Sequence, residues 1–105
     1  MKTVNPEFII KVITVFRDEI RLELPILTIS KKANLNYNAT HRTVQFLLHK
    51  NILNSRKLAK PRSSLISLNK TPETFAYLML AKSSEVNMKG LIEYENKIKK
   101  EFENE

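Results

Sequence analysis

The sequence has 105 residues, of which 42% are hydrophobic, so it is long enough for one domain with its own core and too short for two. Its 18 Lys and Arg residues against 11 Asp and Glu residues give a formal net charge of +7, which favours polyanions such as nucleic acid or anionic lipid as partners. The absence of cysteine and the presence of a single glycine, Gly90, argue against disulfides, thiolate chemistry, cysteine-based zinc sites and glycine-rich phosphate loops.

The hydrophobic residues occur in short runs, such as 8–10 and 77–81. A helix that crosses a bilayer needs about 20 consecutive apolar residues, so we expect no membrane span and no membrane partner. Residues 1–7 also lack the basic start, apolar stretch and small-residue cleavage site of a secretory signal. We therefore expect a cytoplasmic protein.

The basic charge is concentrated in the middle of the chain. Between Glu23 and Glu73 there is no acidic residue, whereas half of the 18 Lys and Arg residues lie there. An ordinary solvated surface mixes both signs of charge, and that remains the alternative for any single Lys or Arg. Carboxylates weaken binding to phosphates, so a segment without them is typical of a nucleic-acid-binding surface. We call residues 24–72 the acid-free segment.

The segment 5–21 predicts the first helix. Asn5 is suited to the N-cap, Pro6 to the first helical position and Glu7 to the first turn, where the helix dipole favours an anion. Apolar residues then recur at spacings of three and four, which predicts one buried stripe. The stripe consists of Phe8, Ile9, Val12, Ile13, Phe16 and Ile20.

Two further helices follow with a very short joint. We predict one from Pro25 through Ala33, ended by Asn34 in the left-handed conformation, and one from Tyr37 to Lys50, capped by Asn36. Two helices joined so closely make a helix-turn-helix. The predicted core positions of the second helix are Thr40, Val44, Leu47 and Leu48.

The pattern changes after Lys50. Residues 52–58 and 63–68 predict a β-hairpin, because apolar and polar residues alternate in the second segment. Thr71 as N-cap and Pro72 at the first helical position predict a helix through Leu80. Residues 83–84 interrupt it, and a final helix is predicted from about residue 84 to the end.

The run from Ile29 to Leu53 resembles the helix-turn-helix of winged-helix regulators such as the ArsR, MarR and PadR families. In that pattern Asn34 stands at the turn, where the families often have Gly, and Leu35 is the buried residue after it. Asn51 stands where the recognition helix closes, again in place of Gly, and the hairpin that follows resembles the wing.

The resemblance implies a mainly α fold with a small β-hairpin, a winged helix-turn-helix with an extra C-terminal helix. The winged-helix domain is expected over residues 1–82 and the C-terminal helix, as a dimerisation element, over 83–105. That helix is also similar to the dimerisation helices of PadR-like proteins and of small basic archaeal chromatin proteins.

The resemblance places the helix 37–50 in the major groove of double-stranded DNA. Arg42 is suited to guanine, and Asn38 or Gln45 to adenine. Lys31 and Lys32 are better placed for phosphates. The wing, residues 58–63, is expected to contact flanking DNA. The full set of predicted DNA-binding residues is Lys31, Lys32, Asn36, Tyr37, Asn38, His41, Arg42, Gln45, Arg56, Lys57, Lys60 and Arg62.

The final helix carries an apolar stripe formed by Leu91, Tyr94, Ile98 and Phe102. We expect it to form a homodimer, because two recognition helices on successive turns of DNA increase both affinity and specificity. The alternative is that the stripe packs against the first helix of the same chain.

These observations favour a homodimeric transcription regulator. One alternative is a DNA-coating chromatin or plasmid-partition adaptor that recruits a further protein partner through its C-terminal helix. The other is a winged-helix module that binds protein rather than DNA. No enzyme is expected, because the sequence offers no set of nucleophile, base and orienting residue. We expect no cofactor and no metal site, since His41 and His49 have no Cys, Asp or Glu near them in the sequence.

Overall fold

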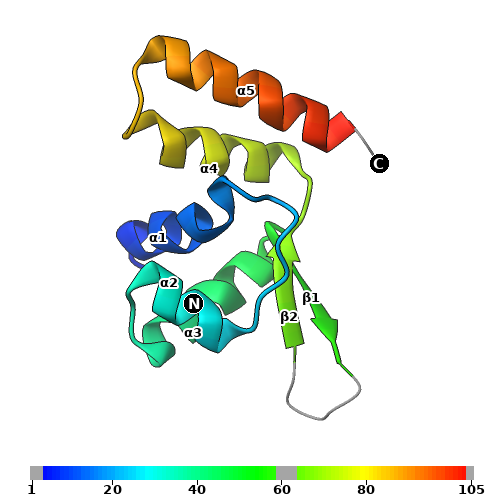
Figure 1. The fold of residues 1–105 in the computed structure, drawn as a ribbon. Coiled ribbons are helices and arrows are strands. Elements are labelled where there is room, and N and C mark those ends of the chain that lie inside the picture. The colour runs from blue at the N-terminus through cyan, green and yellow to red at the C-terminus, as the bar shows by residue number, and fades with distance from the viewer. Residues whose placement is uncertain (1–3, 59–63, 104–105) are drawn as a thin grey trace.

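The computed structural model describes residues 4–58 and 64–103, which form five helices and one two-stranded antiparallel sheet. The elements in chain order are α1 (Pro6–Arg17), α2 (Ile26–Ala33), α3 (Tyr37–His49), β1 (Leu53–Lys57), β2 (Ser64–Leu68), α4 (Pro72–Ser83) and α5 (Met88–Glu103). Figure 1 shows α1 between the α2–α3 pair and α4, with α5 at the opposite end of the molecule from α2 and α3. The predicted fold class is confirmed.

Helix α1 begins as predicted and ends early. The Asn5 side chain accepts a hydrogen bond from the Glu7 backbone N–H at 2.9 Å, and Pro6 occupies the first turn. The helix ends at Arg17 rather than at residue 21, so the predicted end is wrong. Beyond Arg17 the chain forms short turns that point Ile20 inward, where its side chain is buried. The last residue of the predicted apolar stripe, Ile20, is therefore buried although it lies beyond the end of α1.

Two asparagines in the left-handed conformation bracket α3. Asn34 has φ 57° and ends α2, and Asn51 has φ 61° just after the Lys50 C-cap of α3. These are the two positions where the sequence pattern has Asn in place of Gly, and the predicted left-handed turn at Asn34 is confirmed. Each turn redirects the chain sharply, first from α2 into α3 and then from α3 into β1.

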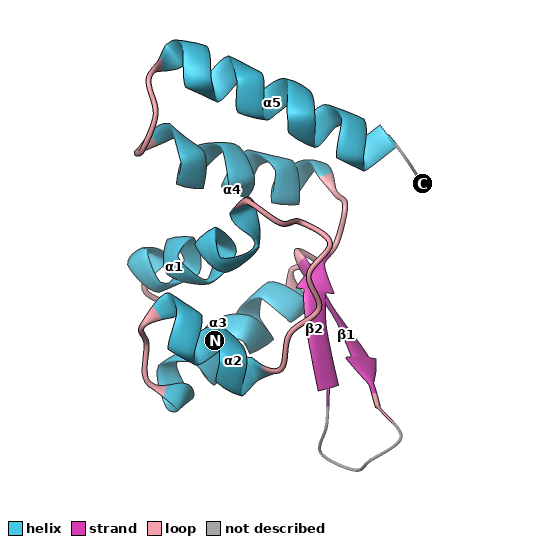
Figure 2. Ribbon diagram, viewed as in Figure 1, coloured by secondary structure: helices cyan, strands magenta, loops and turns pink. Residues whose placement is uncertain are grey.

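The hairpin has a third, very short partner. Strands β1 and β2 pair with Arg56 opposite Leu65, and β1 is one residue shorter at each end than predicted, while β2 begins at residue 64 instead of 63. Leu24 also forms two backbone hydrogen bonds with Ile66, at 2.9 and 2.8 Å, which the sequence did not indicate. Figure 2 shows the loop after α1 running along β2. The α1–α2 connection is therefore tied to strand β2 of the hairpin.

The C-terminal helices begin at side-chain caps. Thr71 caps α4 and Pro72 follows it, as predicted. Helix α5 begins at Met88 rather than near residue 84, because the Asn87 side chain accepts a hydrogen bond from the Gly90 N–H at 3.0 Å. A Cβ at Gly90 would lie 2.9 Å from the Val86 Cβ, so the glycine permits this close approach.

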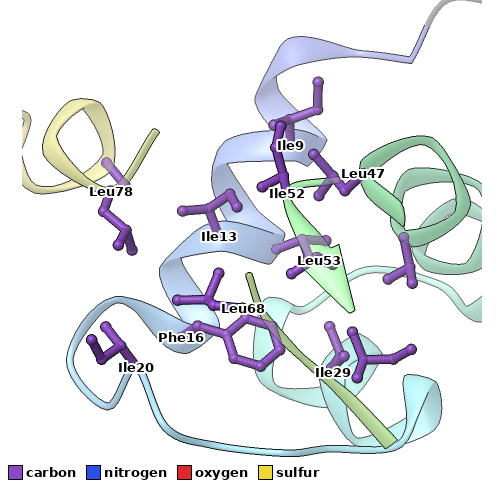
Figure 3. Close-up of a cluster of buried hydrophobic side chains, with 14 of the residues drawn as sticks. Ile9, Ile13, Phe16, Ile20, Ile29, Leu47, Ile52, Leu53, Leu68 and Leu78 are labelled. Atoms are coloured by element: carbon purple, nitrogen blue, oxygen red, sulfur yellow. The ribbon is translucent and has the colours of Figure 1, made fainter. Parts of the chain in front are cut away.

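A single hydrophobic core joins the elements, and Figure 3 shows part of it. The stripe of α1 contributes Ile13 and Phe16, which are fully buried. Around them lie side chains from α2, α3, the hairpin and α4, including Ile29, Leu47 and Leu78. Because α1 packs against α2, α3 and α4, it fixes the helix-turn-helix relative to the C-terminal helices.

A polar contact joins α1 to both C-terminal helices. Arg17 is 7% exposed, donates to the Ala81 carbonyl at 3.3 Å and forms an ion pair with Glu85 at 2.8 Å. The Tyr94 hydroxyl donates to the Arg17 carbonyl at 2.7 Å, and burial raises the pKa of that hydroxyl. The last turn of α1 is therefore held by α4, by the α4–α5 connection and by α5.

The left-handed turn at Asn51 generates a stability prediction. A non-glycine residue without a short polar side chain costs about 1 kcal/mol or more in this conformation, so Asn51→Ala should lower the free energy of unfolding by about that amount. Asn51→Gly should be as stable as the wild type. Urea denaturation measures both, with the exposed helical Asn96→Ala as a control that should lose nothing. Equal stability of the Asn51→Ala and Asn51→Gly variants would contradict the strain argument.

Candidate nucleic-acid interface

Helix α3 buries one face and exposes the other. The buried side chains are Ala39, Thr40, Thr43, Val44 and Leu47. The exposed side chains are Tyr37, Asn38, His41, Arg42, Gln45 and His49. All the α3 residues predicted to contact DNA are thus open to solvent and lie on the side of the helix away from the core.

Two buried threonines support this orientation. Thr40 donates its hydroxyl hydrogen to the Asn36 carbonyl at 2.9 Å, and Thr43 donates to the Ala39 carbonyl at 2.8 Å, so neither hydroxyl is left unsatisfied in the core. The predicted burial of Thr40, Val44 and Leu47 is confirmed, whereas Leu48 is only half-buried.

Asn36 begins α3. Its Oδ1 accepts a hydrogen bond from the Ala39 N–H at 2.8 Å, which confirms the predicted cap. The residue is exposed, so the rest of its side chain amide faces solvent at the start of the helix. Asn36 therefore has a structural role that is independent of any contact with DNA.

The cations beside α3 lack acidic partners. Lys31 and Lys32 lie exposed in the last turn of α2, where the helix dipole favours positive charge. Within residues 4–58 and 64–103, no carboxylate forms an ion pair with Lys31, Lys32, Arg42 or Lys57. Their charges are therefore available to a polyanion.

Two aromatic contacts lie on α3. The rings of Tyr37 and His41 lie 6.0 Å apart between centroids at the start of the helix, and both side chains are exposed. Near the C-terminal end of α3, the Lys50 ammonium lies 5.7 Å from the centroid of the Phe46 ring. The first pair places two hydrogen-bonding side chains at the helix end nearest the Lys31 and Lys32 pair.

Arg56 differs from these predicted DNA-binding cations because it has an acidic partner. Its Nε and Nη2 each donate to a carboxylate oxygen of Glu23 at 3.0 Å. These hydrogen bonds lower the pKa of Glu23. Glu23 lies just outside the acid-free segment and far from Arg56 in the sequence, so local patterns did not indicate the contact.

The predicted tip of the wing lies outside the described residues. This applies to Lys60 and Arg62, which flank Pro61. The described part of the hairpin ends with Lys57 and Leu58, and both side chains are exposed. Lys57, at the end of β1, is therefore the described basic residue nearest to the predicted wing.

The four predicted dimerisation residues pack largely within the chain. Tyr94 and Ile98 are buried, at 6% and 1% exposure. Leu91 is half-buried, and the half-buried Phe102 packs edge-on against Phe75 with ring centroids 5.8 Å apart. The stripe covers α4 and the end of α1, so Tyr94 and Ile98 have little surface left for a second copy. The alternative predicted that this stripe packs against the first helix; α5 instead packs mainly against α4 and reaches the end of α1 through the Tyr94 hydroxyl.

A different set of apolar side chains remains exposed in the C-terminal helices. Leu80 of α4 is 58% exposed, and Met88 and Ile92 of α5 are 69% and 48% exposed. They lie on either side of the connection between α4 and α5. The helical stripe alone did not single them out.

A hollow of about 300 Å³ lies between the end of α1 and α5. It is lined by residues 17–21 and by Lys97, Ile98 and Glu101. Cationic and anionic side chains are equally numerous in this lining, and Arg21 forms an ion pair with Glu101 at 2.8 Å.

Among the residues that the structure describes, no cluster of His, Asp and Glu could hold a metal ion, and no helix is long and apolar enough to cross a membrane.

The arrangement defines a winged helix in which the exposed face of α3 is free of acidic residues. No protein-family model and no curated protein matches the chain. Solved structures with the same fold do match. A mutant of MepR from a multidrug-resistant clinical isolate of S. aureus has a TM-score of 0.59 and 16% identity, and the match covers 92% of this chain and 72% of that one.

Two further structures give the same result. MarR from E. coli has a TM-score of 0.55 and 15% identity over 88% of this chain and 74% of its own. BpsR from Bordetella bronchiseptica, whose DNA binding is regulated by 6-hydroxynicotinic acid, has a TM-score of 0.57 and 14% identity over 96% of this chain. The match covers 66% of the BpsR chain, just under two thirds. The chain therefore has the winged-helix fold seen in MarR-family transcriptional regulators. The resemblances to the ArsR and PadR families stay predictions.

The capping role of Asn36 can be separated from a role in DNA binding. Asn36→Ala should lower the free energy of unfolding by about 1 kcal/mol, because the Ala39 N–H loses its acceptor. Asn36→Asp should keep the wild-type stability, because its carboxylate can accept the same hydrogen bond, and if α3 binds DNA it should bind more weakly through the added negative charge. Urea denaturation and DNA titration measure the two effects, and Asn38→Ala is the control for stability. An Asn36→Asp variant as unstable as Asn36→Ala would contradict the cap.

Proposed function

We propose that the chain is a double-stranded DNA-binding transcription regulator that contacts bases with α3 and flanking DNA with the wing at residues 58–63. The observation that carries the proposal is the outer face of α3, which presents hydrogen-bonding and basic side chains. Neither this face nor the rest of the acid-free segment contains a carboxylate side chain. A face of this kind matches the major groove in shape and charge, since the groove is about 12 Å wide and admits one helix. The fold shared with MarR-family regulators supports the same role.

The α3 side chains divide by chemistry. Arg42 carries a planar guanidinium that can donate two hydrogen bonds to one guanine, and the amides of Asn38 and Gln45 can pair with adenine. Tyr37 and His41, at the N-terminal end of the helix, can donate to base edges or to phosphates. Sequence preference should therefore depend on Arg42, Asn38 and Gln45.

The cations outside α3 are suited to the DNA backbone. Lys31 and Lys32 lie in the last turn of α2, just before α3, and Lys57 is the last residue of β1, which follows α3. Each lysine that neutralises a phosphate releases counterions, which makes the affinity depend on salt but not on sequence.

Salt-dependent DNA titration tests the proposal. The double variant Lys31→Ala and Lys32→Ala should weaken binding to every duplex by about tenfold at low salt, and should reduce the slope of log K against log salt by about 2. Arg42→Ala should instead reduce the preference for a selected site over random DNA, by an amount of about 1 to 3 kcal/mol. Lys100→Ala, which removes an exposed lysine from α5, is the matched control and should change neither.

A titration in which the Lys100→Ala variant loses as much affinity as the α2 variants would contradict this interface. Footprinting separates the regulator from the DNA-coating alternative. A regulator protects one bounded site, whereas a coating protein spreads beyond it as its concentration rises. Wild-type protein that binds no duplex would favour the protein-interaction module.

We further infer that the regulator is a homodimer that pairs through the exposed apolar residues near the α4–α5 connection. Leu80, Met88 and Ile92 are large, apolar and 48% exposed or more in the single chain. The half-buried Leu91 adjoins them in the sequence of α5. Burying such side chains between two copies is favourable, and α5 lies at the far end from α3, which leaves both recognition helices open to DNA.

Light scattering coupled to size-exclusion chromatography tests the dimer. The wild type should have the mass of two chains, and the double variant Met88→Glu and Ile92→Glu should have the mass of one, because two charges would be buried at the interface. Leu27→Glu is the control, since Leu27 is 54% exposed but lies on α2. A monomeric wild type at all concentrations would refute the dimer.

A further inference from the structure

One acidic side chain reaches the basic wing. Glu23 directly precedes the acid-free segment, and its two carboxylate oxygens accept hydrogen bonds from Nε and Nη2 of Arg56, each at 3.0 Å. Arg56 thus differs from Lys57, the next residue of β1, which forms no ion pair with a carboxylate of the described residues. The contact neutralises a guanidinium on the strand that leads into the wing.

The backbone holds Glu23 in this place. Its neighbour Leu24 forms a hydrogen bond in each direction with Ile66 of β2, and β2 pairs with β1 so that Arg56 lies opposite Leu65. Alternation along paired strands points Glu23 and Arg56 to the same side of the sheet, away from the buried Ile66. The backbone position of Glu23 therefore does not depend on the ion pair itself.

The pair is suited to exchange with phosphate. A guanidinium binds carboxylate and phosphate with the same forked geometry. Both side chains are open to water, at 59% exposure for Arg56 and 38% for Glu23, so solvent screens their attraction and little stability is lost when it breaks. A displaced Glu23 would stay beside the phosphates because its backbone is tied to β2.

We propose that Glu23 competes with DNA phosphates for Arg56 and thereby limits the affinity of the β-hairpin for the DNA backbone. The inference rests on the proposed DNA-binding function. Because phosphate contacts do not depend on sequence, Glu23 weakens binding to duplexes of any sequence. Glu23 thereby lowers the affinity for non-specific DNA, with which any specific site has to compete.

A mutant cycle on a random-sequence duplex tests the proposal. Glu23→Gln should tighten binding about threefold to tenfold at low salt and should steepen the slope of log K against log salt by about 1, because Arg56 becomes available to a phosphate. Arg56→Gln in the wild-type background should weaken binding, because it leaves the Glu23 carboxylate unpaired beside the phosphates. In the Glu23→Gln background, the same substitution should remove most of the gain.

The matched control is Glu19→Gln, which removes the same charge from the α1–α2 connection without touching the wing and should leave the affinity unchanged. An equal gain for Glu19→Gln and Glu23→Gln would overturn the proposal, because the effect would then come from net charge. A gain for Glu23→Gln that persists without Arg56 would also overturn it. Wild-type protein that binds DNA while Glu23→Gln has no effect refutes this inference alone, whereas wild-type protein that binds no duplex refutes the proposed function as well.

Discussion

The structure depends on the two left-handed turns at either end of α3. The turn at Asn34 aims the chain from α2 into α3, and the turn at Asn51 aims it from α3 into the hairpin. Between them, the Asn36 cap fixes where the helix starts and the buried Thr40 and Val44 fix which face it turns inward. Once these residues set the start of α3 and its buried face, helical geometry alone determines which side chains of α3 point outward. Asparagine meets the same backbone requirement as glycine here, because its short polar side chain tolerates positive φ.

Most of the fold could be predicted because its signals are local. The caps at Asn5, Asn36 and Thr71 lie within three residues of the N–H groups that they bind. The contacts that prediction missed join distant parts of the chain. The hydrogen bonds between Leu24 and Ile66 and the ion pair between Glu23 and Arg56 each need a fold before they can form. For the candidate site, the exposed face of α3 followed from helical spacing, but the partner of Arg56 did not.

The C-terminal stripe shows a second limit of sequence patterns. Periodicity indicates that one face of α5 is apolar, but it does not indicate what covers that face. Tyr94 and Ile98 are covered by the same chain, while Met88 and Ile92, beside the stripe, remain exposed. The distinction between an internal contact and a surface for a partner depends on where α4 lies, which residues 83–105 do not encode by themselves.

The Arg17 contact has a consequence for how the molecule unfolds. Arg17 belongs to α1, its guanidinium bonds to the carbonyl of Ala81 in α4, and its own carbonyl accepts the hydroxyl of Tyr94 in α5. Detaching α5 would break the hydrogen bond of the buried Tyr94 hydroxyl, whereas detaching α4 would remove the Ala81 carbonyl from the buried Arg17 guanidinium. The end of α1 is thus linked by buried polar contacts to both C-terminal helices, so the hydrogen-bonding needs of Arg17 are met only when α4 and α5 lie in their places.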